Sequence, residues 1–475
     1  MRDSLALSSA LEHPQTPRAV LALSLGLVAL QAAVAPLWDA DLWWLLRAGE
    51  DILREGVTPH ENRYGFTAPT HPWVMHEWLL GAVGASLVRA FGLPGVALLR
   101  IAATLTVGAF AWRVARRGAR PLAASVAVAA MFALFGGRFE SARPLGLAYA
   151  PAMVVLWAAF APALRPRHAL AALLATALWT NAHGSFPLAL VTLAAGAWES
   201  PHRHRLALLA ACAAVTLANP YGPRMHDLVA RYLGGVDGDA VAVVHQRIVE
   251  WWPLHRAPLR MYTPPELLGY AAVITLWLRA LRDARWRPRA VFGLALCAMA
   301  LRHQRHLQLA GLLSLPLLAP VLAPGQERPS PRARGVLGGV AAAALLLWAV
   351  TARTRPVERW VNPTRDPRDF SRLHAALPRD ARVFVTLPFA GYAVFLRGPG
   401  VFFDPRNDCY PAAVLREALD VDEGLLPPAE AHRALRARGT THAIAWCAGR
   451  SSRSLNGWQL LRREGALCLW AAPTR

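Results

Sequence analysis

Two carboxylates stand directly behind the first long apolar run of this chain. The segment PLWDADLWWLL, residues 36–46, holds Asp39 and Asp41 one residue apart among three tryptophans. A carboxylate at the edge of an apolar layer can act as a general base toward a hydroxyl group. The alternative is that both aspartates are simply solvated at a helix end, and that the tryptophans form an interfacial belt.

Later segments offer cations and a third carboxylate. These residues are Glu140 between Arg138 and Arg143 in GGRFESARP, His183 in TNAHGS, and Arg302 and Arg305 in LRHQRH. Guanidinium groups bind phosphate through paired, charge-assisted hydrogen bonds. Together with a carboxylate base, they describe transfer of a group from a lipid phosphate to a hydroxyl or an amine. Alternatively, Glu140 only pairs with its arginine neighbours, and the other residues are boundary or loop positions.

The composition indicates a polytopic membrane protein. Of 475 residues, 55% are hydrophobic, and apolar runs of membrane length recur along the chain. The net charge of +21 comes from arginine alone. Because these arginines are spread over short loops and no nucleic-acid-binding motif accompanies them, we expect membrane lipids and no nucleic acid as partners. The chain also lacks a P-loop and a dinucleotide-binding glycine motif, which favours a lipid-linked donor over a nucleotide.

About eleven apolar runs are predicted membrane spans. They cover residues 19–37, 93–112, 121–137, 144–164, 168–180, 186–198, 206–218, 266–281, 290–301, 307–323 and 335–352. Segment 78–91 is short and contains Arg89, and counting it as a span would disturb the excess of arginine in the loops on one side. We therefore predict an interfacial helix over 78–91 and a cytoplasmic N-terminus over 1–18.

The membrane domain is predicted to cover 19–352, with an outer loop at 38–77, and the pattern changes at residue 353. RVFVT, YAVFL, VFF, HAIAW, WQLL and LCLWAA predict strands, whereas AAVLREALD and PAEAHRALRAR predict helices. Residues 353–475 are thus expected to form a small extracytoplasmic α/β domain. Cys409, Cys447 and Cys468 fall in it, and one disulfide of unassigned pairing would suit an oxidising compartment.

The acidic pair belongs to a longer pattern. It is followed by GEDILREGVTPHENRYGFT and by HPWVMHEWLL at the start of the interfacial helix. This succession resembles the GT-C integral-membrane glycosyltransferases, above all the protein mannosyltransferase and aminoarabinose-transferase branches. WTNAHGSFPLAL, LANPYG and FFDPRNDCYP also resemble a group of bacterial membrane proteins placed in that superfamily. The resemblance implies a polyprenyl-phosphate sugar donor and a catalytic carboxylate in the first outer loop.

Site residues follow from this resemblance position by position. Asp41 matches the catalytic aspartate, while Asp39 and Glu140 would position the acceptor or a metal ion. His76 and Glu77 fall where the family contacts the donor. The cations available for the donor phosphate are His76, Arg143, His183, Arg302 and Arg305. No cofactor is firmly implied; a divalent Mg²⁺ or Mn²⁺ held by the two aspartates is the one candidate. The family's Asp-Glu pair reads Asp-Ala-Asp here, and the Trp-Trp-Asp-Tyr-Gly signature of oligosaccharyltransferases is absent.

These observations predict an inverting glycosyltransferase of the bacterial inner membrane that acts on an extracytoplasmic lipid, glycan or protein. The alternative is a non-catalytic polytopic protein, either an envelope scaffold or a transporter. A transporter is disfavoured because the predicted spans contain almost no acidic residues, whereas transport pathways place ionisable groups inside the membrane.

Overall fold

The structure is a computed structural model of the whole chain. It describes residues 15–37, 39–136, 143–234, 239–325, 367–397 and 400–473, together with Leu346 and Val350. These residues divide into two compact units that do not follow chain order. Unit 1 comprises the described parts of Met1–Ala35, Val96–Asn219 and Glu250–Thr354, and unit 2 comprises those of Pro36–Gly95, Pro220–Val249 and Arg355–Arg475.

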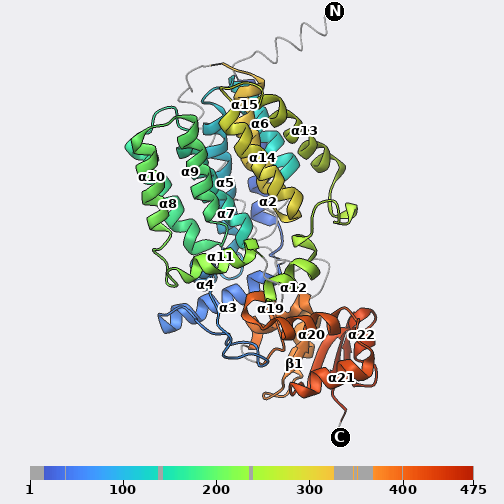
Figure 1. Cartoon of the computed structure of the whole chain (residues 1–475). Helices are drawn as coiled ribbons and strands as arrows, with labels where there is room; N and C mark the ends of the chain where they lie inside the picture. Colours follow the sequence, from blue (N-terminus) through green and yellow to red (C-terminus); the bar gives the residue numbers. More distant parts are fainter. Residues whose placement is uncertain are drawn as a thin grey trace, which may run out of the picture. The chain divides into compact units, whose positions relative to one another are not determined.

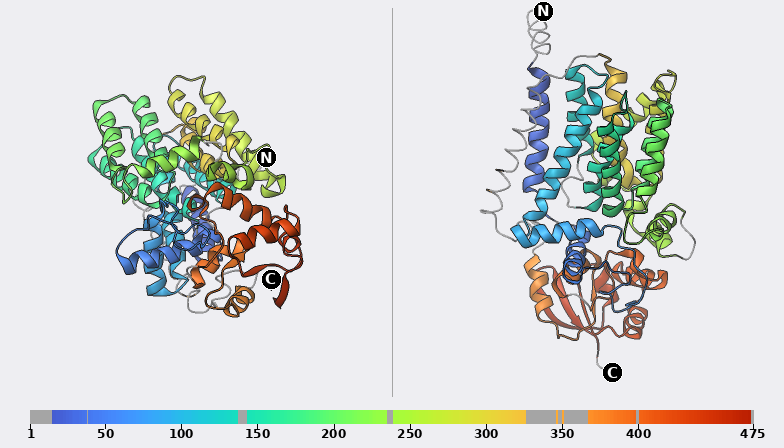
Figure 2. Two further views of the ribbon diagram at one scale, coloured as in Figure 1. Left: turned by 60° about the horizontal axis from the view of Figure 1, so that its bottom comes forward. Right: turned by 90° about the vertical axis from the view of Figure 1, so that its left-hand side faces the viewer.

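Unit 1 is a helical bundle. Its helices are α2 (Thr16–Val34), α5 (Gly95–Ala115), α6 (Pro121–Phe135), α7 (Pro144–Ala159), α8 (Pro166–Ala182), α9 (Pro187–Glu199), α10 (Arg203–Val215), α13 (Pro264–Ala280), α14 (Arg287–Arg302) and α15 (Leu307–Leu322). Figures 1 and 2 show most of them running side by side. Helices α6 to α9 each begin at a proline, which suits the first helical position because its φ is fixed and it lacks an N–H.

Most predicted spans coincide with these helices. Each predicted span from 19–37 to 307–323 overlaps one helix of unit 1, whereas 335–352 lies almost entirely outside the described residues. Within the described part of the chain, three helices are long and apolar enough to cross a membrane, namely Thr16–Val34, Gly95–Ala115 and Gln304–Leu322. The other apolar helices are shorter, so the total of eleven spans stays a prediction.

Buried arginines satisfy carbonyl groups at the ends of two helices of unit 1. Arg100 is 1% exposed and donates from Nη2 to the carbonyl oxygen of Ala35, 2.6 Å away, just after α2. Arg205 donates to the carbonyl oxygens of Ala159 and Ala161 at the end of α7. Helix ends leave such carbonyls without intrahelical partners, and a buried guanidinium needs acceptors. Each pairing therefore meets both requirements at once.

Unit 2 combines helices with one small sheet. Its helices are α3 (Ala40–Glu55), α4 (Trp78–Phe91), α11 (Arg224–Gly234), α12 (Ala240–Arg247), α18 (Pro367–Ala375), α19 (Leu387–Arg397), α20 (Ala412–Asp422), α21 (Pro428–Ala437) and α22 (Arg450–Ser454). Its strands are β1 (Val383–Val385), β2 (His442–Trp446), β3 (Gln459–Glu464) and β4 (Leu467–Ala471). Figure 1 shows α20, α21 and α22 beside the sheet. The predicted α/β character of the C-terminal part is thus confirmed, and α4 has the bounds predicted for the interfacial helix.

The sheet has the strand order β1-β2-β4-β3. Strands β1 and β2 pair in parallel, while β4 is antiparallel to both β2 and β3. The predicted strand VFF forms only two isolated bridges, from Val401 to Val383 of β1 and to Gly65 of the first loop. The first loop is therefore joined to the edge of the C-terminal sheet.

The predicted strand YAVFL, residues 392–396, is wrong, because this segment lies in α19. Tyr392 and Phe395 pack against Trp43 of α3, with ring centroids 4.8 and 5.4 Å away. A helix places these two side chains, three residues apart, on one face, whereas a strand would direct them to opposite faces. Tertiary packing against α3 thus decides the structure of this apolar segment.

A close helix contact fixes α3 against α4. A Cβ atom on Gly49 of α3 would lie 1.9 Å from the carbonyl oxygen of Gly81 in α4, so any larger residue would force the two helices apart. Elsewhere in unit 2, Cys447 and Cys468 form a disulfide with a Cα–Cα distance of 5.0 Å, and Cys409 is a buried free thiol. The disulfide links the end of β2 to β4.

Candidate functional site

Asp39 and Asp41 lie at the N-terminus of α3. Asp39 precedes the helix, and its Oδ1 accepts a hydrogen bond from the backbone N–H of Asp41 at 2.9 Å, which is N-cap geometry. Asp41 lies in the first turn, and its Oδ1 accepts from Nε1 of Trp44 at 3.3 Å. Asp39 is 7% exposed, whereas Asp41 is only half-buried. Asp41 is therefore the more accessible carboxylate of the pair.

His76 and Glu77 form an ion pair just before α4. Nε2 of His76 lies 3.3 Å from Oε1 of Glu77, and Glu77 is 8% exposed. Burial lowers the pKa of His76, but the charges of Glu77 and Asp408 outweigh this effect and raise its pKa to about 9. Burial also raises the pKa of Asp408, although His76 opposes it. A charged cluster thus joins the first loop to the segment FFDPRNDCYP.

A fully buried ion pair strengthens the same junction. Nε of Arg406 donates to Oδ1 of Asp404 at 2.8 Å and Nη2 donates to Oδ2 at 2.6 Å, with both side chains 0% exposed. Nη2 also donates to Oδ1 of Asn62 at 2.8 Å. The guanidinium lies 4.6 Å from the ring centroid of Tyr64 and 4.4 Å from that of Trp73. We call these five residues the Arg406 clamp.

The clamp is a structural element. Burial lowers the pKa of Arg406, but the charge of Asp404 outweighs it and holds this pKa above its usual value, so the pair stays ionised. The backbone N–H of Arg406 also donates to Oδ1 of Asp404 at 3.0 Å, which is the turn chemistry expected for this motif. The hydroxyl of Tyr64 donates to Oδ2 of Asp51 at 2.7 Å and so ties the clamp to α3.

Two of the predicted phosphate-binding arginines, Arg143 and Arg305, contact adjacent residues of unit 1. Arg143 forms an ion pair with Glu250. The guanidinium of Arg305 lies 4.2 Å from the ring centroid of the next residue, Trp251, and Nδ1 of His303 lies 2.6 Å from its carbonyl oxygen. Burial lowers the pKa of His303, so its imidazole is neutral at pH 7. We call these five residues the basic cluster.

His183 and Arg302 also belong to unit 1. His183 is 8% exposed and follows α8 directly. Its Nδ1 accepts a hydrogen bond from the backbone N–H of Ser185 at 3.1 Å and lies 2.8 Å from the hydroxyl oxygen of the same residue. Arg302 ends α14, is exposed and forms no hydrogen bond or ion pair with another described residue.

The predicted site residues thus fall into two sets. Unit 2 contains Asp39, Asp41, His76 and Glu77; unit 1 contains Arg143, His183, Arg302 and Arg305; and Glu140 lies outside the described residues. Among the residues that the structure describes, no three His, Cys, Asp or Glu side chains come together to hold a metal ion. Asp39 uses one of its carboxylate oxygens to cap α3.

Sequence reasoning missed two features of this region. No local pattern indicates that the carboxylate of Glu250 is the partner of Arg143. Nor does one indicate that the buried pair of Asp404 and Arg406 binds the first loop through Asn62. An Asp-Pro-Arg sequence between aromatic residues was the available signal, but the partner Asn62 lies 344 residues away from Arg406 in the chain.

The fold has relatives among solved structures, although no protein-family model and no curated protein matches the sequence. The archaeal oligosaccharyltransferase AglB from Archaeoglobus fulgidus, in complex with an inhibitory peptide and a dolichol-phosphate, aligns with a TM-score of 0.55 at 12% identity, over 90% of this chain and 69% of that chain. ArnT from Cupriavidus metallidurans bound to undecaprenyl phosphate aligns with a TM-score of 0.52 at 14% identity, over 96% and 98% of the two chains. Its apo form gives 0.54 at 15% identity.

Both proteins are membrane glycosyltransferases of the GT-C superfamily. This chain therefore has the GT-C fold, and the resemblance seen in the sequence is confirmed at the level of the fold. The likeness covers both the helical bundle and the small C-terminal sheet, since it extends over 90% or more of this chain. It does not by itself define the reaction, because one fold can serve several functions.

Proposed function

We propose that this protein is a membrane glycosyltransferase that moves a sugar from a polyprenyl-phosphate donor to an extracytoplasmic acceptor. The observation that carries the proposal is the likeness to ArnT, which was solved with undecaprenyl phosphate and which aligns along almost the full length of both chains. AglB, solved with a dolichol-phosphate, supports the same class of lipid carrier. Asp41 in the first turn of α3 supplies a candidate base, and the basic cluster supplies candidate cations for the phosphate.

In the proposed reaction, Asp41 removes the proton from the acceptor hydroxyl or amine. The acceptor lone pair then forms a bond to the anomeric carbon, and the bond from that carbon to the phosphate oxygen breaks. The electron pair leaves with the polyprenyl phosphate, which is already a stable anion and needs no dedicated acid. A single direct displacement inverts the anomeric carbon. Asp39 acts indirectly, because it caps α3 and holds the first turn in place.

The arginines of unit 1 are proposed to contact the donor phosphate. Arg143 is paired with Glu250, so a phosphate would compete with this carboxylate for its guanidinium. Arg302 is exposed and has no described partner, so it would meet the phosphate without breaking an existing pair. His76 is a candidate cation of unit 2 because its raised pKa keeps it protonated at pH 7.

We propose that the protein lies in the bacterial inner membrane, with its N-terminus in the cytoplasm and residues 353–475 on the opposite side. The disulfide between Cys447 and Cys468 supports this orientation, since disulfides persist in oxidising compartments and are rare in the cytosol. The excess of arginine in the loops on the other side supports it independently. Helix α4 would then lie along the outer membrane surface.

The test compares the wild type with Asp41→Asn, both purified in detergent, against a panel of radiolabelled polyprenyl-phosphate sugars. Labelled acceptor in a membrane extract and free sugar from donor hydrolysis are counted separately. We expect transfer by the wild type and a loss of about 100-fold or more in the variant, which is the usual contribution of a general base. Donor binding should persist in the variant.

Glu61→Gln is the matched control, because Glu61 is an exposed carboxylate of the same loop. It should transfer sugar at the wild-type rate. Equal transfer by wild type and Asp41→Asn would remove Asp41 from the mechanism. A folded wild-type protein that neither binds nor consumes any donor would contradict the enzyme as a whole.

A further inference from the structure

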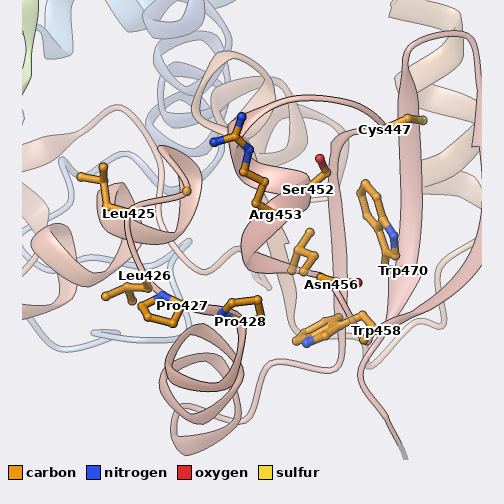
Figure 3. Close-up of a pocket in the computed structure, with 13 residues that line it drawn as sticks. Leu425, Leu426, Pro427, Pro428, Cys447, Ser452, Arg453, Asn456, Trp458 and Trp470 are labelled. Atoms are coloured by element: carbon orange, nitrogen blue, oxygen red, sulfur yellow. The ribbon is translucent and has the colours of Figure 1, made fainter.

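A pocket of about 640 Å³ lies in the C-terminal part of unit 2, and nothing in the proposed reaction uses it. Figure 3 shows Trp458 and Trp470 on one side and Pro427 and Pro428 on the other, with residues of α22 between them. Its volume is within the range of about 300–1,000 Å³ that is common for small-molecule sites.

The walls of this pocket are held firmly. The disulfide of Cys447 ties the end of β2 to β4, the strand that carries Trp470. Gly424, at the start of the α20–α21 turn, has a φ of +64°, and a Cβ atom there would lie 2.2 Å from the carbonyl oxygen of Arg450. This close approach fixes the turn against the start of α22. The pocket is thus bounded by a sheet, a helix and a turn that are tied together at two points.

Two polar groups of the pocket wall lack partners within the described part of the chain. The guanidinium of Arg453 and the side-chain amide of Asn456 make no hydrogen bond or ion pair with any described residue, and both residues are exposed. A guanidinium donates hydrogen bonds and an amide both donates and accepts them, so the two groups can bind the polar groups of a ligand.

The charge of the pocket is one-sided. None of the 13 described residues that line it is Asp or Glu, and Arg453 is its one ionised side chain. Arginine binds carboxylate and phosphate groups in a paired geometry. The indoles of Trp458 and Trp470 add rigid apolar surface with a polar edge, which suits a ligand with both C–H and hydroxyl groups.

We propose that this pocket binds an anionic saccharide, that is, a sugar unit bearing a carboxylate or a phosphate. The indoles would contact the C–H surface of the sugar ring, Asn456 would bind its hydroxyls, and Arg453 would bind the anionic group. The inference deepens the proposed function. Its biological meaning rests on that function, because the saccharide would be part of the acceptor. Binding itself needs no turnover.

The experiment measures binding to the full chain in detergent by isothermal titration calorimetry. The probes are cellobiouronic acid and cellobiose, which differ only in one carboxylate, together with glucose 6-phosphate and glucose. We expect the acidic member of each pair to bind about tenfold more tightly than the neutral one, which is the size of a charge-assisted contact. Inorganic phosphate alone should bind more weakly than glucose 6-phosphate.

Three variants locate the site. Arg453→Gln should remove the preference for the acidic sugars, while Arg450→Gln should leave it unchanged, because Arg450 is an exposed arginine of the same helix that does not line the pocket. Trp458→Ala removes one of the two aromatic walls and should weaken the binding of all the sugars about threefold. Asp41→Asn should bind them like the wild type, which separates this site from the transfer reaction.

Several outcomes would overturn the proposal. Equal binding of acidic and neutral sugars, or an unchanged preference in Arg453→Gln, would show that Arg453 does not bind an anionic group of the ligand. Equal binding of inorganic phosphate and glucose 6-phosphate would show that the pocket does not bind the sugar ring. No binding of any probe at about 10 mM would contradict the site altogether, even if the protein transfers sugar normally.

Discussion

Replacing Arg406 with methionine tests whether the Arg406 clamp holds unit 2 together. Methionine keeps most of the apolar stem but removes two hydrogen bonds to Asp404, one to Asn62 and two ring contacts. The carboxylate of Asp404 would stay fully buried, with the hydroxyl of Tyr410 at 2.6 Å as a remaining donor. Removing one partner of a buried ion pair costs about 3–5 kcal/mol. Since domains are stable by about 5–15 kcal/mol, we expect a large loss.

The assay is thermal unfolding of the full chain in detergent, followed by tryptophan fluorescence, with limited proteolysis as a second readout. Arg438→Met is the matched control, because Arg438 also makes two hydrogen bonds to one carboxylate, that of Glu417, but with side chains 28% and 20% exposed. Exposed pairs contribute about 1 kcal/mol or less. Adding Asp404→Asn to Arg406→Met should recover part of the loss. If Arg406→Met unfolds no earlier than Arg438→Met, the reasoning is refuted.

Three further predictions concern unit 2. Reducing the disulfide, or replacing Cys447 and Cys468 with serine, should lower the free energy of unfolding by about 3 kcal/mol, as estimated for a loop of this length, and a melting temperature unaffected by reductant would contradict this. Gly49→Ala should destabilise the protein strongly in the same melting assay, whereas Gly26→Ala, where a Cβ atom meets nothing within 4 Å, should not. The pKa of His76 is raised to about 9. The protonated imidazole therefore contributes fully to the stability of the fold below pH 6.5, and this contribution declines as the pH rises through 9. The melting temperature of His76→Gln should lack this decline.

Local patterns in the sequence predicted much of the fold. The interfacial helix 78–91 coincides with α4, and HAIAW coincides with β2, because each is an apolar segment bounded by clear breaks in the pattern. The sequence predicts a strand over 392–396, whereas the structure has a helix there. A short apolar run carries no periodicity, and its packing partner lies in α3. The apolar runs from 19–37 to 307–323 match the bounds of helices of unit 1 to within a few residues, because local composition determines both; their role as membrane spans stays a prediction.

The candidate site was less accessible to sequence reasoning. Asp39 stands directly before a helix, which is the signal for an N-cap, and the structure gives it that contact. The pairing of Arg143 with Glu250 spans 107 residues, and no local pattern announces it. The roles of these residues therefore stay predictions, and the partners that limit or direct their chemistry depend on contacts between distant segments.

The division of unit 2 among three separate stretches of chain has a consequence for how the protein is made. The side chain of Asn62 cannot accept its hydrogen bond from Arg406 until that residue is synthesised, 344 residues later. At about 5–20 residues per second, this interval lasts roughly 20–70 s. During that time the aromatic face of α3 lacks its partner α19, whose Tyr392 and Phe395 pack against Trp43. The nascent chain therefore needs the lipid surface or a chaperone as a temporary cover, and truncation before residue 404 should produce a protein that is degraded rather than one that merely lacks a domain.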